Sequence, residues 1–199
     1  MSQSLLGTGV IARLARGLLA GLIVAATVQA YGPNLLFFFT ILSNTLAVVL
    51  IAGQAVAPGW MGRNGTFRGA VTLYMTITGL VYAVLLAPLE IDVGNYAPWA
   101  NFVHHTLAPS AVLIDWLLFP PARKLPREAP LFWLGFPAAY FAFSLVRGSM
   151  TGWYPYPFLD VGDIGAGGVA AYSVVILGLF WAIGIFLRWW ADQRGVIPT

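Results

Sequence analysis

Two polar side chains in the apolar stretches of this chain could together carry out nucleophilic catalysis. Thr40 lies near the start of one apolar segment, and His105 lies near the start of another. A hydroxyl is a weak nucleophile until a neighbouring base takes its proton. The imidazole of histidine suits that role because its ordinary pKa is about 6.5. The pair therefore predicts attack on a carbonyl carbon, provided that the fold brings the two side chains together.

The two residues are expected to lie at a matching depth in a membrane. At a rise of about 1.5 Å per residue, Thr40 lies about 8 Å and His105 about 9 Å from the expected outer end of its own segment. Asn44 lies one helical turn below Thr40, and Asn101 lies one turn above His105. Either amide could orient the imidazole or stabilise an oxyanion.

A purely structural interpretation of each residue stays open. Threonine in a membrane helix often hydrogen-bonds its own backbone or a neighbouring helix, which is the alternative for Thr40. His104 and His105 are the only histidines of the chain, and either could simply hold two helices together. The chemistry therefore depends on whether the two segments meet.

Two charged residues allow similar alternatives. Asp115 lies about 15 Å beyond His105 along the same segment, too far to orient the imidazole. We expect it to anchor its helix or to pair with Arg123 or Lys124. Arg147 stands near the expected outer surface, either as an ordinary interfacial arginine or as the partner of an acidic headgroup or a substrate carboxylate.

Metal and cofactor chemistry has little support in the sequence. The chain has no cysteine, so thiolate ligands and disulfides are excluded. His104 and His105 are adjacent and point about 100° apart on a helix, so they cannot bind one ion together. The net charge of +3 comes from basic residues scattered between apolar segments. We therefore predict no metal, no cofactor and no nucleic-acid partner.

The composition predicts a chain that is dissolved in lipid. Hydrophobic residues make up 59% of it and charged residues 9%, against about 25% charged residues in a soluble domain. A membrane-spanning helix needs about 20 mostly apolar residues. The expected spans are residues 11–29, 35–56, 69–87, 99–119, 131–146 and 167–190. We predict an all-α polytopic membrane protein with six transmembrane helices in a single domain, residues 1–199.

The basic residues predict the orientation of these spans. Nine of the ten fall on one side of the predicted membrane: Arg13, Arg16, Arg63, Arg68, Arg123, Lys124, Arg127, Arg188 and Arg194. Basic residues favour the cytoplasmic side, so both termini are expected there. The first apolar run is expected to be an uncleaved span rather than a signal peptide. The predicted location is the cell membrane, the inner one if the source is bacterial.

Three segments match motifs of a known family. They are residues 37–40 (Phe-Phe-Phe-Thr), residues 99–106 (Trp-x-Asn-x-x-x-His-Thr) followed by the acid Asp115, and residues 151–160 (Thr-Gly-Trp-Tyr-Pro-Tyr-Pro-Phe-Leu-Asp). They resemble the androgen-induced protein and androgen-dependent TFPI-regulating protein family, together with its small bacterial relatives. The third segment is the most specific, since the family has Thr-Gly, an aromatic residue, Tyr-Pro-Phe-Leu and an acid there.

The resemblance implies an intramembrane threonine hydrolase that cleaves fatty acid esters of hydroxy fatty acids. By motif, the nucleophile falls on Thr40. The histidine falls on His105 when counted from Trp99 and on His104 when counted back from Pro109, and we favour His105. The expected partners are the lipid bilayer and an amphiphilic lipid ester.

Further residues are expected to support this reaction. The ester would enter from the outer leaflet and lie among spans 2, 4 and 6, under a roof formed by the loop that carries Tyr154, Tyr156 and Asp160. Arg147 would hold a free carboxylate of the substrate. Two other functions stay open: a non-enzymatic small transporter or lipid-binding protein, and a structural partner of a larger membrane complex. A dead-end pocket holding Thr40 and His105 would favour the hydrolase.

Overall fold

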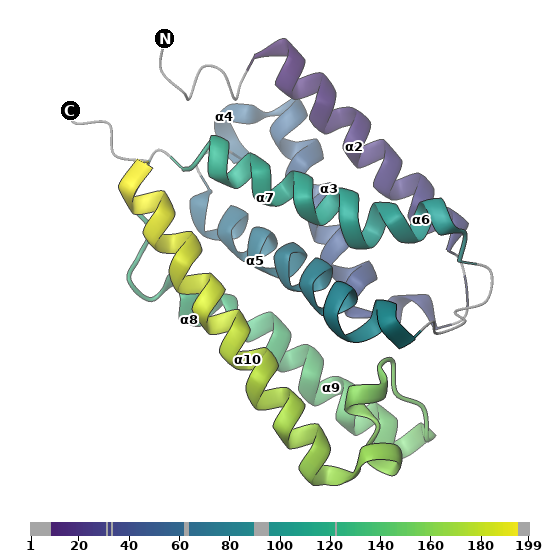
Figure 1. Ribbon diagram of the computed structural model, residues 1–199. Coiled ribbons are helices and arrows are strands. Elements are labelled where there is room, and N and C mark those ends of the chain that lie inside the picture. Colours follow the sequence, from purple (N-terminus) through teal and green to yellow (C-terminus); the bar gives the residue numbers. More distant parts are fainter. Residues whose placement is uncertain are drawn as a thin grey trace.

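The computed structural model describes residues 9–30, 32, 34–61, 64–89, 96–121 and 123–194, and all regular structure within them is helical (Figure 1). Five helices are long and apolar enough to cross a membrane: Val10–Gln29 (α2), Phe39–Val56 (α3), Gly65–Leu89, Ala129–Thr151 and Val161–Arg194 (α10). The prediction of an all-helical chain with membrane-crossing helices is confirmed to this extent.

Two of these helices are composite. Gly65–Leu89 consists of α5 (Gly65–Val81), a π-helical turn η2 (Tyr82–Leu86) and a short 3-10 turn η3 (Ala87–Leu89). Ala129–Thr151 consists of α8 (Ala129–Trp133) and α9 (Gly135–Thr151). Three short elements complete the structure: η1 (Leu35–Phe37), α4 (Pro58–Met61) and η5 (Pro157–Leu159).

The segment predicted as the fourth span is helical but irregular. Pro98–Phe102 (α6), the π-helical turn Val103–Leu107 (η4) and Ala108–Leu118 (α7) follow one another without a gap. Pro109 has no backbone N–H to donate to the carbonyl of His105, so the α-helical ladder cannot run through this point. The chain widens there into a π turn, a feature frequent at functional sites. Both histidines lie in that turn.

Residues with particular backbone chemistry set several helix ends. The side chain of Asn64 accepts a hydrogen bond from the N–H of Phe67 and thereby caps α5. Gly152 ends α9 with a positive φ of 69°, which a side chain would disfavour. Gly165 has the same φ and kinks α10 near its start. Helix α10 begins before this kink, at Val161, six residues before the predicted boundary at residue 167.

The helices form two groups that meet along α5. Helix α3 packs against α2 and α5, α7 packs against α5, and α10 packs against α5 and α8. Figure 1 shows α2, α3 and α7 on one side of α5, and α8, α9 and α10 on the other. One buried apolar cluster lies among α2, α3, α5 and α7, and a second joins α8 and α10 to α3, α5 and α7. The start of α2 and the end of α10 lie at the same end of the bundle (Figure 1).

Asp115 joins three helices at the end of the bundle away from the start of α3. Its Oδ1 accepts a hydrogen bond from Nε of Arg16 in α2 at 3.0 Å, and its Oδ2 lies 3.3 Å from a terminal nitrogen of Arg68 in α5. Both arginines are buried. The expected partners Arg123 and Lys124 are exposed, so that pairing was wrong. The arrangement of the helices decides which basic residues reach Asp115, and it places α2 and α5, with their distant arginines, beside α7.

Replacing Asp115 by alanine is expected to destabilise the protein by about 3 kcal/mol, because two buried guanidinium groups would lose their acid. Tryptophan fluorescence during thermal unfolding in detergent measures the change. The matched control is Asp192→Ala, which removes a single i,i+4 ion pair with Arg188 and should cost about 0.5 kcal/mol or less. Equal unfolding midpoints for the two variants would contradict this role of Asp115.

Candidate active site

The hydroxyl of Thr40 and the ring of His105 are in direct contact. Oγ1 of Thr40 lies 3.2 Å from Nε2 of His105. Thr40 is the second residue of α3 and His105 lies in η4, so the contact joins two elements 65 residues apart. The two residues are 7% and 9% exposed. The structure therefore brings together the two residues that the sequence analysis singled out.

The backbone of α6 determines which ring nitrogen of His105 carries the proton. Nδ1 of His105 lies 3.1 Å from the carbonyl oxygen of Asn101, one turn earlier. A carbonyl oxygen can only accept a hydrogen bond, so Nδ1 is the protonated nitrogen. Nε2 then presents a lone pair to the hydroxyl of Thr40. A general base needs this arrangement in order to take a proton from a nucleophile.

The Thr40 hydroxyl is free for this contact because of its place in the helix. Threonines in helix interiors commonly donate to the carbonyl four residues earlier. Six threonines among the described residues do so: Thr27, Thr45, Thr72, Thr76, Thr78 and Thr151. For Thr40 the corresponding carbonyl belongs to η1, before α3 begins. Its proton is therefore directed to His105 rather than to its own helix.

Tyr82 holds the imidazole of His105 in place and was not predicted. The two rings are stacked, with centroids 4.1 Å apart and planes inclined by 19°. The side-chain amide of Asn101 donates a hydrogen bond to the Tyr82 hydroxyl at 2.6 Å. The expected role of the Asn101 side chain is thus divided: the backbone carbonyl of Asn101 orients the imidazole, and its side-chain amide positions the Tyr82 ring that stacks on it. An interfacial tyrosine is too common to have signalled this role.

Gly79 allows α5 to approach the π turn closely. A Cβ atom at this position would lie 3.2 Å from the carbonyl oxygen of His105 and 3.0 Å from Cβ of Pro109. Both distances are tighter than ordinary van der Waals contact. The missing side chain therefore lets α5 pack directly against the backbone that carries the histidines.

His104 faces the opposite way and binds α2. Its Nε2 lies 3.0 Å from Oγ1 of Thr27, whose own proton is donated to the carbonyl of Ile23. Nε2 must therefore be the donor in this contact. Its Nδ1 accepts a hydrogen bond from the hydroxyl of Tyr96. Both nitrogens are occupied, so His104 crosslinks α2 and η4, while His105 alone faces Thr40.

Asn44 fixes the spacing between α3 and η4, which carry Thr40 and His105. Its Nδ2 donates to the carbonyl of Thr40 at 2.9 Å and to the carbonyl of His104 at 3.2 Å. The side chain is fully buried, and its Oδ1 has no hydrogen-bond partner among the described residues. Asn44 therefore joins the backbones of α3 and η4, rather than contacting the imidazole of His105.

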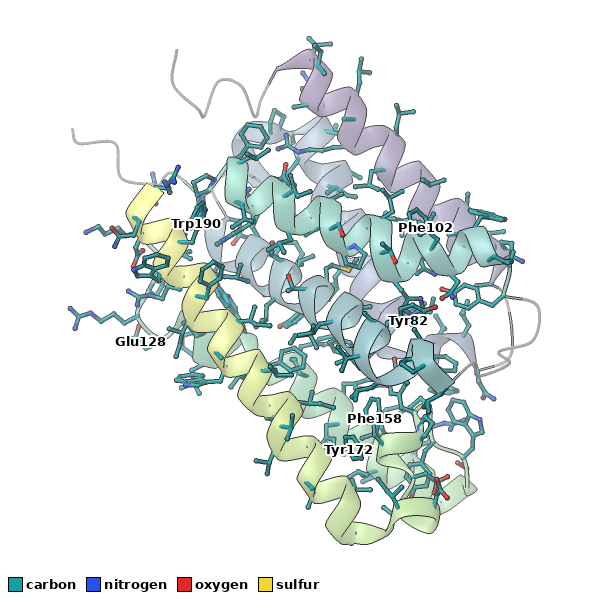
Figure 2. All side chains as sticks on the ribbon, in the orientation of Figure 1. Tyr82, Phe102, Glu128, Phe158, Tyr172 and Trp190 are labelled. Atoms are coloured by element: carbon teal, nitrogen blue, oxygen red, sulfur yellow. The ribbon has the colours of Figure 1, made fainter. Side chains whose placement is uncertain are left out.

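Thr40 lies on the wall of a cavity of about 680 Å³, counting the part that opens to the surroundings. The cavity is bounded by α3, α5, η2, α9, η5 and α10, and most of its lining is apolar. Six of the aromatic and aliphatic side chains are Phe39, Tyr140, Phe141, Phe158, Ile176 and Phe180. Figure 2 shows Phe158 at one end of the bundle, opposite to Trp190. The predicted fourth span contributes no residue to this lining, so the cavity holds Thr40 but not His105. Of the three spans expected to surround the ester, only the second and the sixth line the cavity.

The loop between α9 and α10 only partly forms the expected roof. Tyr156 lines the cavity, and its hydroxyl accepts a hydrogen bond from the backbone N–H of Thr40 at 3.3 Å. The ring of Tyr154 packs instead on the backbone of Gly148. Asp160 caps the start of α10, where its Oδ1 accepts from the N–H of Gly162 at 2.9 Å. One of the three predicted loop residues therefore reaches the site.

Arg147 anchors the loop next to the cavity. Its guanidinium lies over the rings of Phe37, at 3.9 Å, and Trp153, at 4.7 Å. A terminal nitrogen donates to Oδ1 of Asn34 at 3.3 Å. These contacts join η1 to the loop after α9. Binding of a substrate carboxylate by Arg147 stays a prediction.

The described residues contain no group of three or more His, Asp or Glu side chains placed to hold a metal ion. The contact between the Thr40 hydroxyl and the His105 imidazole is an arrangement that can carry out acyl transfer. Comparison of the chain with known protein families, with characterised proteins and with solved structures found no match.

Proposed function

We propose that the protein is a membrane-embedded hydrolase of lipid esters, with Thr40 as nucleophile and His105 as general base. The observation that carries the proposal is the 3.2 Å contact between the Thr40 hydroxyl and the unprotonated nitrogen of His105, at the wall of an apolar cavity. A nucleophile is activated when an adjacent base can take its proton.

The reaction follows from these two groups. Oγ1 of Thr40 attacks the ester carbonyl carbon while Nε2 of His105 takes the hydroxyl proton. The tetrahedral intermediate collapses as His105 returns that proton to the leaving alcohol, which gives an acyl-threonine. Water then attacks the acyl group, His105 takes a proton from the water, and Thr40 leaves with that proton. The products are a carboxylic acid and an alcohol.

The cavity lining supports a lipid as the substrate. Its aromatic and aliphatic side chains suit an acyl chain and would not hydrate a small polar solute. This observation favours hydrolysis over the transport of a polar solute. The motif residues around Thr40 and His105 add support, since they resemble a family that cleaves fatty acid esters of hydroxy fatty acids. An amphiphilic ester of this kind is the proposed substrate.

The proposed membrane placement uses six spans. The sixth is the continuous helical run of α6, η4 and α7, which is not one of the five long, apolar helices. Both termini are then cytoplasmic, in agreement with the positive-inside rule. Thr40, at the start of α3, lies toward the outer side in this arrangement, within reach of water. The proposed location is the cell membrane, the inner one in a bacterium.

A fluorophosphonate with a long alkyl chain tests the proposal. Its phosphorus should form a bond to Oγ1 of Thr40 as fluoride leaves. Mass spectrometry of the purified protein is then expected to find the added mass on the peptide that contains Thr40. The modification should abolish hydrolysis of a long-chain p-nitrophenyl ester. If the protein hydrolyses no ester, or carries the label on another side chain, the proposal is wrong.

A further inference from the structure

The hydroxyl of Tyr156 lies beside the nucleophile at the N-terminal end of α3. Its oxygen accepts a hydrogen bond from the backbone N–H of Thr40 at 3.3 Å. The Thr40 side chain, the Tyr140 hydroxyl and the N–H of Phe39 are also within hydrogen-bonding reach of it. Tyr156 is thus the one loop residue that contacts both the nucleophile and the first turn of its helix.

This position makes the Tyr156 hydroxyl a polarised donor. The first N–H groups of a helix have no partner within the helix, and its N-terminal end carries a partial positive charge. Helix α3 is 18 residues long, and its N-cap residue Phe38 makes no side-chain cap. The oxygen of Tyr156 acts as the missing acceptor. An oxygen that accepts from N–H groups donates its own proton more strongly.

The neighbouring phenol of Tyr140 is committed elsewhere. Its hydroxyl donates to the carbonyl of Phe37 at 2.9 Å, a bond that joins α9 to η1. Burial raises the pKa of Tyr156, so its phenol stays protonated and keeps a hydrogen to donate. Both tyrosines line the cavity, and of the two it is Tyr156 that accepts the hydrogen bond from Thr40. Its proton can turn from the neighbouring hydroxyl oxygens to an ester oxygen bound in the cavity.

We infer that Tyr156 is a catalytic residue that donates a hydrogen bond to the carbonyl oxygen of the ester as Thr40 attacks. Negative charge develops on that oxygen in the tetrahedral intermediate, and a donor held beside it lowers the barrier. Tyr156 keeps its proton throughout, so no bond to it forms or breaks. The inference rests on the proposed hydrolase function.

Steady-state kinetics of Tyr156→Phe in the full-length protein test the inference. The expected result is a fall in kcat of about 10²–10³-fold, with KM for a long-chain ester unchanged within experimental error. Tyr154→Phe is the matched control, because that ring lies in the same loop and packs on Gly148, outside the cavity lining. It should keep the parental rate.

Two inhibitors separate catalysis from structure. The Thr40 oxygen is expected to add to the carbonyl carbon of a long-chain trifluoromethyl ketone, which gives an oxyanion. An alkyl ether of equal length has no carbonyl and gives none. Tyr156→Phe should lose affinity for the ketone in parallel with kcat/KM and keep its affinity for the ether. Equal losses for both compounds would overturn the inference and leave Tyr156 a packing role.

Thr40→Ala, measured alongside, distinguishes the two levels of the proposal. If Thr40→Ala is inactive and Tyr156→Phe retains full kcat, the oxyanion role is wrong and the hydrolase proposal stands. If Thr40→Ala hydrolyses the ester at the parental rate, both fail.

Discussion

Ester hydrolysis by the purified protein is expected to fall by a factor of at least about 10⁴ when Thr40 is replaced by alanine. The substitution removes the oxygen that forms the acyl intermediate, and His105 then has no hydroxyl to deprotonate. Thr40→Ser keeps an oxygen at this position and should retain measurable activity. Mass spectrometry of the released acid in detergent or in liposomes measures the rates.

Thr45→Ala is the control for the loss of a hydroxyl in the same helix. Thr45 is exposed and donates to the carbonyl of Ile41, so its hydroxyl is not part of the site. Its variant should hydrolyse the ester at the parental rate. Comparable rates for Thr40→Ala and Thr45→Ala would show that Thr40 is not the nucleophile.

The second large effect is expected from a comparison of the two adjacent histidines. His105→Ala should lower kcat by about 10³-fold or more, because no second imidazole or carboxylate of the described residues contacts the Thr40 hydroxyl. His104→Ala should keep the catalytic rate of the folded protein. It should cost about 1–3 kcal/mol of stability, since Thr27 and Tyr96 lose their buried partner. Initial rates and thermal unfolding, measured on the same preparations, separate the two effects.

A reversed result would be equally clear. If His104→Ala abolishes turnover in protein with an unchanged unfolding midpoint, while His105→Ala remains active, the assignment of the base is wrong. The two residues share one backbone segment and one side-chain type. Each variant is therefore the control for the other.

Much of the helical framework follows from composition. A chain with this fraction of apolar residues is expected in a bilayer, where the backbone N–H and C=O groups must pair with one another, as they do in a helix. The matching depths of Thr40 and His105 could also be predicted from the sequence, since the rise per residue of a helix converts a sequence position into a distance along the helix. Which helices lie next to one another in the bundle could not be predicted from the sequence. The ion pairs of Asp115 with Arg16 and Arg68 depend on that arrangement, as does the absence of the fourth span from the cavity wall.

Local backbone geometry was the other feature that the sequence left open. Pro109 interrupts the α-helical hydrogen-bond ladder, but whether a helix kinks or widens into a π turn at a proline depends on its neighbours. That turn decides which histidine faces α3. The motif spacing alone left His104 and His105 as alternatives, and the hydrogen bonds of each ring distinguish them.

The imidazole of His105 is oriented by a neutral carbonyl of its own helix, where many hydrolases use an aspartate. The resting pair of Thr40 and His105 is consequently electroneutral. In the proposed reaction, charge separation arises only during turnover, when the imidazolium and the oxyanion form together and are then neutralised. A charged side chain at this depth would oppose insertion of its segment into the bilayer. The proposed reactive centre is built from uncharged side chains, so it adds no such cost to insertion.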